Sequence, residues 1–123
     1  EKGYIPELGV YINSDEYLYK LANNVLKDEQ KMNVFSGVIA SGDIFCTEFN
    51  MSKKINKKFN ALCVEMEGAS IAQICYLSHI PFLIIRSISD TPNNNNTITY
   101  ETFLQDSSKK VAEAMTNILK KIN

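Results

Sequence analysis

Three short apolar runs, each followed by acidic residues, restrict most strongly how this chain can fold. The runs occupy residues 34–41, 61–66 and 82–89. Runs of this length, rich in β-branched residues and apolar almost throughout, are typical of buried strands in a parallel sheet. The acidic residues at their ends are Asp43, Glu65, Glu67 and Asp90. The sequence therefore predicts three strands with acidic side chains at or just after their ends.

Helical patterns separate these runs. Apolar residues at helical spacing predict helices over residues 15–30, 50–59 and 67–79, and a terminal helix from Thr99 onward. Ser14 is the predicted N-cap of the first helix, and a short strand is expected at residues 8–12. Alternating strands and helices predict an α/β fold with right-handed crossovers, and 123 residues suffice for a single domain over residues 1–123.

Composition excludes several classes of function. The 13 basic and 14 acidic residues leave a net charge of -1, which argues against nucleic acid as the main partner. No apolar run approaches the roughly 20 residues of a membrane-spanning helix. Three cysteines without a close pair fit a reducing cytoplasm, and a single His leaves too few soft ligands for a metal site.

The acidic strand ends are the candidate functional residues. In open α/β sheets, ligands bind at the carboxyl ends of the strands, here Ser41-Gly42-Asp43, Glu65-Met66-Glu67 and Ser89-Asp90. Each acid alone also has a structural explanation: Asp43 and Asp90 can form turns, and Glu65 and Glu67 can serve the N-terminus of the following helix. Together, half-buried carboxylates are costly unless they are paired, so they indicate a polar ligand site. The standard glycine-rich dinucleotide and P-loop motifs do not occur.

Three motifs give the chain a family resemblance. SGDIF at 41–45, VEMEGASIA at 64–72 and IRSISD at 85–90 resemble, in order and spacing, the C-terminal half of the 5'-methylthioadenosine/S-adenosylhomocysteine nucleosidases of the purine nucleoside phosphorylase superfamily. The resemblance implies a three-layer α/β/α fold with a largely parallel or mixed central sheet, of which this chain is the C-terminal part. It also implies a homodimer. No cofactor is expected, because carboxylates can supply the acid–base chemistry of hydrolysis.

The resemblance assigns roles to seven residues. Asp90 matches the general acid that protonates adenine N7, and Glu67 matches the carboxylate that binds the ribose hydroxyls. Met66 packs against the sugar, Phe45 stacks on adenine, and the backbone of Cys46 reads the base edge. The remaining two are Tyr100, which lines the pocket for the 5'-substituent, and Glu65, which supports the active site.

These roles suit hydrolysis of a purine N-glycosidic bond, in which the leaving base takes a proton and the sugar develops positive charge. In the family the water-activating Glu comes from an N-terminal region that this chain lacks, so we expect a fragment, or a truncated and inactive relative. Two alternatives stay open. One is a phosphate-dependent purine nucleoside phosphorylase, and the other is a non-catalytic module that binds adenosine or forms a dimer.

Overall fold

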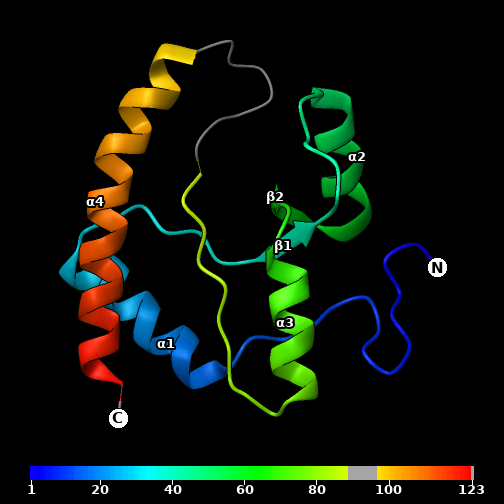
Figure 1. The fold of residues 1–123 in the computed structure, drawn as a ribbon, viewed down its shortest axis with the longest axis horizontal. Coiled ribbons are helices and arrows are strands. Elements are labelled where there is room, and N and C mark those ends of the chain that lie inside the picture. Colours follow the sequence, from blue (N-terminus) through cyan, green and yellow to red (C-terminus); the bar gives the residue numbers. More distant parts are fainter. Residues whose placement is uncertain (89–96, 123) are drawn as a thin grey trace.

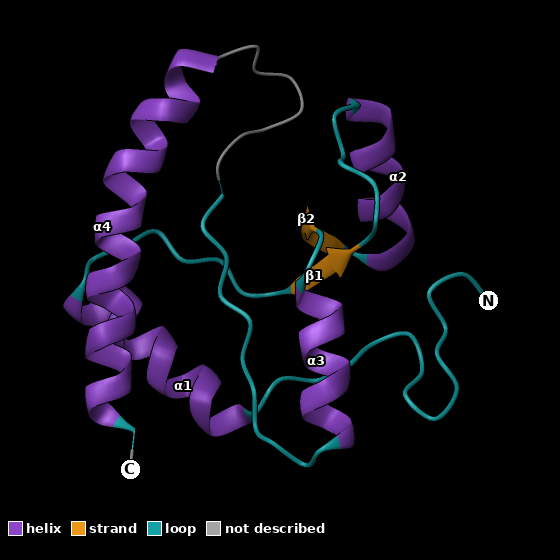
Figure 2. Cartoon of the chain, viewed as in Figure 1, coloured by secondary structure: helices purple, strands orange, loops and turns teal. Residues whose placement is uncertain are grey.

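The computed structural model describes residues 1–88 and 97–122, with only the backbone described over residues 97–103. Figure 1 shows the path of the chain and Figure 2 its secondary structure. The elements in chain order are α1 (Glu16–Asn24), a single π-helical turn η1 (Val25–Glu29), β1 (Val38–Ser41), α2 (Phe49–Phe59), β2 (Ala61–Glu65), α3 (Gly68–Leu77) and α4 (Thr97–Lys121). The predicted α/β character is confirmed.

The strands β1 and β2 form a parallel pair connected through α2. Their register places Val38 opposite Ala61 and Ser41 opposite Glu65, so both strands end at the same edge of the sheet. The N–H of Gly42 donates to the carbonyl of Glu65 at 3.0 Å and continues the ladder by one residue. The acidic end of β2 therefore lies beside the SGD sequence at the end of β1, as the sequence predicts.

The predicted third strand over residues 82–89 is not observed in its described part. Residues 82–88 have no strand assignment, although they run between α3 and α4 in Figure 1. The carbonyl of Phe82 accepts from the N–H of Asp15 at 2.8 Å, and Leu83 and Ile85 pack against the core. The apolar pattern correctly indicated burial, but a strand also needs a partner to supply a backbone ladder. Likewise, the expected strand at residues 8–12 is replaced by an isolated bridge between Ile5 and Gly9.

The helices follow the predicted ranges with local differences at their ends. The N-cap of α1 is Asp15 instead of Ser14, because the Asp15 carboxylate accepts from the N–H of Leu18 at 2.9 Å. The predicted helix 15–30 consists of α1 and the π turn η1. Helix α2 ends at Phe59, and its C-cap Asn60 adopts the left-handed conformation that Asn tolerates.

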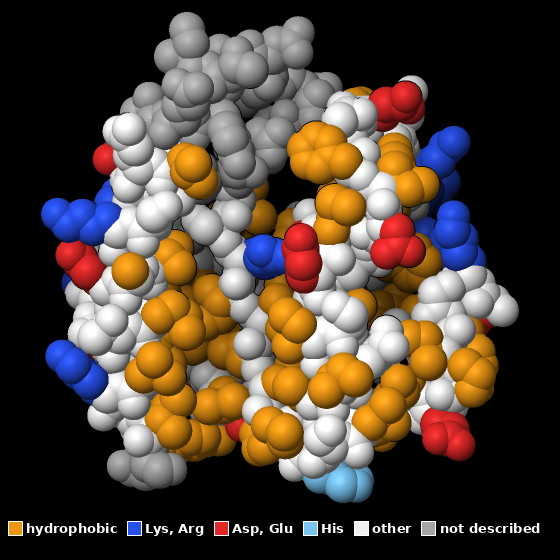
Figure 3. Space-filling view, viewed as in Figure 1, with side chains coloured by type: hydrophobic (Ala, Val, Ile, Leu, Met, Phe, Trp, Pro, Cys, Tyr) orange, Lys and Arg blue, Asp and Glu red, His pale blue; other side chains and the backbone are white. Residues whose placement is uncertain are grey.

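The cluster of buried apolar residues at the hydrophobic core lies between the N-terminal helix and α4. Its buried residues are Ala22, Val25, Leu26, Ala114 and Ile118. By contrast, the outward-facing large residues of α3, including Ile71, Ile74 and Leu77, are exposed. Figure 3 shows apolar side chains over much of the viewed face. No helix within the described ranges has the length and apolar character needed to cross a bilayer.

Candidate active site

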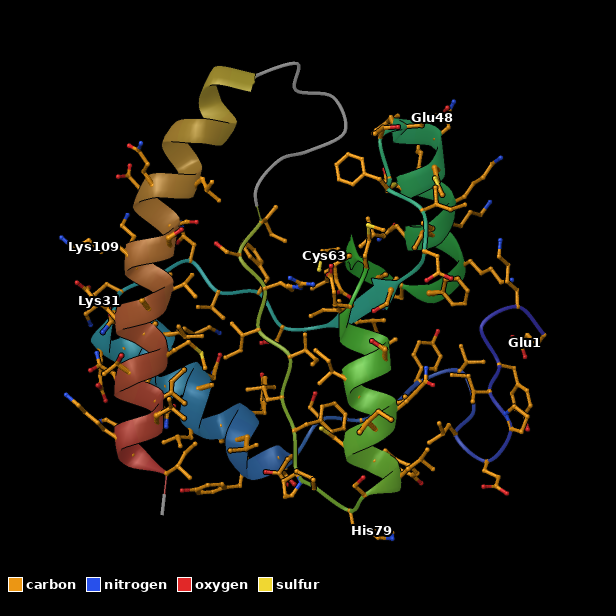
Figure 4. All side chains as sticks on the ribbon, viewed as in Figure 1. Glu1, Lys31, Glu48, Cys63, His79 and Lys109 are labelled. Atoms are coloured by element: carbon orange, nitrogen blue, oxygen red, sulfur yellow. The ribbon has the colours of Figure 1, made fainter. Side chains whose placement is uncertain are left out.

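The Glu65 carboxylate, at the end of β2, is held by hydrogen bonds from three parts of the chain. Its Oε1 accepts from the Ser41 hydroxyl and from the N–H of Gly68, the latter at 2.9 Å. Its Oε2 accepts from the N–H groups of Glu67 at 3.0 Å and Gly68 at 2.7 Å. The side chain is only 8% exposed. Figure 4 labels Cys63, two residues earlier on β2, near the centre of the molecule.

Arg86 connects the Glu65 carboxylate to that of Glu67. Its Nε donates to Oε2 of Glu65 at 3.1 Å, and its Nη2 is hydrogen-bonded to both carboxylates. The side chain of Arg86 is 36% exposed and that of Glu67 is 66% exposed. Figure 3 shows acidic and basic side chains in contact near the middle of the viewed face. The cluster therefore has a buried side at Glu65 and an open side at Glu67.

The hydrogen bonds keep Glu65 ionised. Burial raises the pKa of the Glu65 carboxyl, but the hydrogen bonds from Ser41, Arg86 and the backbone outweigh burial and lower this pKa to about 2. The hydrogen bond with Glu65 in turn raises the pKa of the Arg86 guanidinium above its already high value. Burial and the nearby Glu65 charge raise the pKa of the Cys63 thiol. Glu65 and Arg86 therefore form a fixed ion pair beside a neutral thiol.

Two small residues allow this close packing. The Ser41 Oγ accepts from the N–H of Ala69 at 2.8 Å while its hydroxyl donates to Glu65, so it connects β1 to the first turn of α3. A Cβ atom on Gly68 would lie 2.8 Å from Oε1 of Glu65, closer than van der Waals contact allows. A larger residue at position 68 would therefore force the Glu65 carboxylate to shift.

The two acids of the VEMEG motif have different roles. Glu65 serves the N-terminus of α3, which was the structural alternative for this residue, because it accepts from the N–H of Gly68. Glu67 occupies the N-cap position of α3 but makes no side-chain cap hydrogen bond, and its carboxylate binds Arg86 instead. The structure therefore brings Glu65 and Glu67 together and leaves the latter accessible.

The other predicted site residues lie outside this cluster or outside the described residues. Phe45, 67% exposed, and the half-buried Cys46 lie in the loop between β1 and α2. Met66 is 44% exposed between the two acids. Asp90 falls outside the described residues, as does the side chain of Tyr100. The roles of all these residues stay predictions.

Sequence reasoning did not identify Ser41 and Arg86 as partners of Glu65. In the sequence, Ser41 stands at the end of a predicted strand and Arg86 stands within the IRSISD motif, and neither position indicates its partner. The signal available for Arg86 is a charge inside the most apolar run of the chain, since a buried cation requires an anionic partner. Nothing in the local pattern around Ser41 specifies a partner 24 positions away.

The cluster borders a hollow of about 1350 Å³. Ser41, Gly68 and Arg86 line the hollow, together with core residues such as Leu83 and Ile85, whereas Phe45, Met66 and Glu67 are not among its lining residues. The hollow is thus the incompletely covered interior of the fold.

Comparisons with known proteins agree on the family. The model of the phosphorylase superfamily matches residues 4–122. A 5'-methylthioadenosine/S-adenosylhomocysteine nucleosidase of Oceanobacillus iheyensis is 36% identical over 121 residues, covering 98% of this chain and 52% of that protein. Futalosine hydrolase of Helicobacter pylori superposes with a TM-score of 0.86 at 34% identity, covering 98% of this chain and 51% of the other.

A second similar structure contains a bound ligand. A protein of Borrelia burgdorferi described as a 5'-methylthioadenosine/S-adenosylhomocysteine nucleosidase, bound to adenine, superposes with a TM-score of 0.85 at 37% identity. The match covers 98% of this chain and 52% of that one. The chain therefore belongs to the phosphorylase superfamily and has part of its α/β fold. Its similarity within the superfamily is to nucleosidases, and it spans about half the length of the relatives that it matches.

Proposed function

We propose that the protein carrying this chain hydrolyses the N-glycosidic bond of 5'-methylthioadenosine or S-adenosylhomocysteine and releases adenine. The observation that carries the proposal is the Glu67 carboxylate, which is 66% exposed and is held by Arg86 at the end of the sheet where α/β proteins bind ligands. The names of the similar proteins, and the adenine bound to one of them, support this substrate class.

Glu67 is suited to bind the ribose. A carboxylate is a pure acceptor with two oxygens, so it can accept hydrogen bonds from two neighbouring hydroxyls. Its negative charge also stabilises the positive charge that develops on the sugar as the glycosidic bond breaks. We assign Met66, beside Glu67 and partly exposed, to packing against the sugar.

Asp90 is the proposed general acid. Arg86 binds both glutamates, and Asp90 follows it by four positions in the sequence. Protonation of the base at N7 by Asp90 makes adenine a neutral leaving group. Phe45 is proposed to stack on adenine, the Cys46 backbone to bind the base edge, and Tyr100 to line the pocket for the 5'-substituent.

The pairing of Arg86 favours water over phosphate as the nucleophile. Phosphorolysis needs cationic groups that are available to the phosphate. In the described residues, the guanidinium of Arg86 is already shared between two carboxylates. We propose that the chain is the C-terminal half of a cytoplasmic homodimeric enzyme, and that the residue activating the water comes from the other half.

The experiment measures release of the free base by the complete natural product of the gene that carries this sequence. Methylthioadenosine, S-adenosylhomocysteine and futalosine are tested with and without phosphate; futalosine is included because a futalosine hydrolase is among the similar structures. Asp90→Asn should lower kcat by roughly 10² to 10⁴. Glu67→Gln should raise KM, because it weakens ribose binding, and should also lower kcat, because it removes the charge that stabilises the developing cation. The matched control is Glu16→Gln, a carboxylate in an exposed ion pair with Lys20.

Each alternative has its own result. Formation of ribose 1-phosphate only in the presence of phosphate identifies a phosphorylase. Preference for futalosine corrects the substrate but retains the reaction class. Binding of adenine without turnover of any of the three nucleosides identifies a non-catalytic module and refutes the proposal.

A further inference from the structure

Glu65 has no remaining capacity to bind a ligand directly. A carboxylate offers about four acceptor positions. Those of Glu65 face the Ser41 hydroxyl, the N–H groups of Glu67 and Gly68, and the guanidinium of Arg86. With the side chain 8% exposed, a substrate hydroxyl could reach it only by displacing one of these donors. A role for Glu65 must therefore act through its neighbours.

Those neighbours connect Glu65 to Glu67 by two routes. One is direct, because the N–H of Glu67 donates to Oε2 of Glu65 at 3.0 Å. The other passes through Arg86, whose Nη2 binds both carboxylates. The backbone and the side-chain end of Glu67 are thus both tied to the same buried anion, while the carboxylate of Glu67 stays 66% exposed.

We propose that Glu65 is a positioning residue: it holds Arg86 and the backbone of residue 67 so that the Glu67 carboxylate is oriented before the nucleoside binds. Ser41 completes the arrangement by connecting Glu65 to the N–H of Ala69. This inference rests on the proposed function, because it takes Glu67 as the ribose-binding group. Its physical basis is the conformational entropy that a long exposed side chain loses when it binds a ligand. A side chain that is already restrained loses less of this entropy on binding.

The kinetic test compares a ligand with ribose and one without. Glu65→Gln keeps the size of the side chain but removes its charge and turns an amide N–H₂ toward the surrounding donors. Loss of a charged hydrogen-bond partner corresponds to roughly a tenfold or greater effect. In the complete gene product, Glu65→Gln should raise KM for methylthioadenosine about tenfold or more, whereas the Kd for adenine should change less than about twofold. A general loss of folding would weaken both.

Variants of Ser41 test the inference independently, in case Glu65→Gln does not fold. Ser41→Ala removes one hydrogen bond to the carboxylate and one acceptor for Ala69, and it should raise KM for methylthioadenosine in the same direction by a smaller factor. Ser41→Thr retains the hydroxyl and should restore the wild-type KM. Glu16→Gln again serves as the control, because its ion pair with Lys20 is exposed.

A double-mutant cycle with Glu67→Gln tests whether Glu65 acts on the substrate through Glu67. If Glu65 acts through Glu67, adding Glu65→Gln to Glu67→Gln should change KM little beyond the effect of Glu67→Gln alone. Fully additive effects, an equal loss of adenine binding, or a Ser41→Thr variant as impaired as Ser41→Ala would each overturn the inference.

Amide hydrogen exchange separates this inference from the proposed function. Glu65→Gln should speed exchange at the N–H groups of residues 67–69 by about tenfold, and Glu16→Gln should not. If the wild-type protein releases no base from any nucleoside, the proposed function fails, yet faster exchange would still support Glu65 as the group that positions Glu67. Unchanged exchange at these amides overturns the inference whatever the activity.

Discussion

The buried Glu65 carboxylate should make the free energy of unfolding depend on pH in a way that one substitution can isolate. Its pKa is lowered from an ordinary 4.5 to about 2 in the folded protein. Because the folded pKa is the lower of the two, ionisation of Glu65 stabilises the folded state above pH 4.5. This stabilisation is lost as the pH falls from 4.5 through 2.

The magnitude follows from the two pKa values. The difference of about 2.5, at about 1.4 kcal/mol for each pH unit, corresponds to about 3 kcal/mol. The side chain is 8% exposed, so solvent screening reduces this value little. The contribution should be nearly complete at pH 6 and mostly absent at pH 2.

The assay is urea unfolding of the complete gene product, followed by circular dichroism at pH 6, 4 and 2. Wild type is compared with Glu65→Gln, so that the titration of all other carboxylates cancels. The difference in free energy of unfolding between the two proteins should shrink by about 3 kcal/mol between pH 6 and pH 2. A difference that stays constant over this range would show that the hydrogen bonds do not hold Glu65 ionised.

Two further predictions concern residues that shape the ends of helices. Asp15→Ala should lower the free energy of unfolding by about 1 kcal/mol, because it removes the acceptor for the N–H of Leu18, whereas Ser14→Ala should have little effect; equal losses in urea unfolding would contradict Asp15 as the cap. Gly68→Ala should cost about 1 to 3 kcal/mol, because the added methyl group meets Glu65. An unchanged urea midpoint would show that the carboxylate can move aside.

Local sequence patterns were sufficient for the elements whose neighbours are close in the chain. The apolar spacing of residues 50–59 and the run at 61–66 predicted α2 and β2 to within a residue, since each is specified by its own pattern and end signals. The run at 82–89 shows the limit. Its composition indicates burial, which Leu83 and Ile85 confirm, but whether a buried segment gains a ladder depends on a partner elsewhere.

The candidate site was predictable in part for a related reason. Parallel strands end at a common edge, so the proximity of Glu65 and Glu67 to the SGD sequence followed from topology. The separate environments of the two acids did not, because they depend on where Arg86 and Ser41 point in three dimensions. A strand pattern places both acids on one face; it does not distinguish the buried one from the exposed one.

The location of the core has a consequence for the order in which the chain can fold during synthesis. Val25 and Leu26 are covered by Ala114 and Ile118, and the Glu29–Lys121 ion pair joins positions 92 residues apart. Until α4 has been translated, Val25 and Leu26 lack the cover that Ala114 and Ile118 provide, and the described residues that precede α4 cover them only in part, through Met32, Val34, Leu83 and Ile85. A premature stop before Ala114 would therefore leave apolar surface of the first helix uncovered by α4, and such surface favours aggregation.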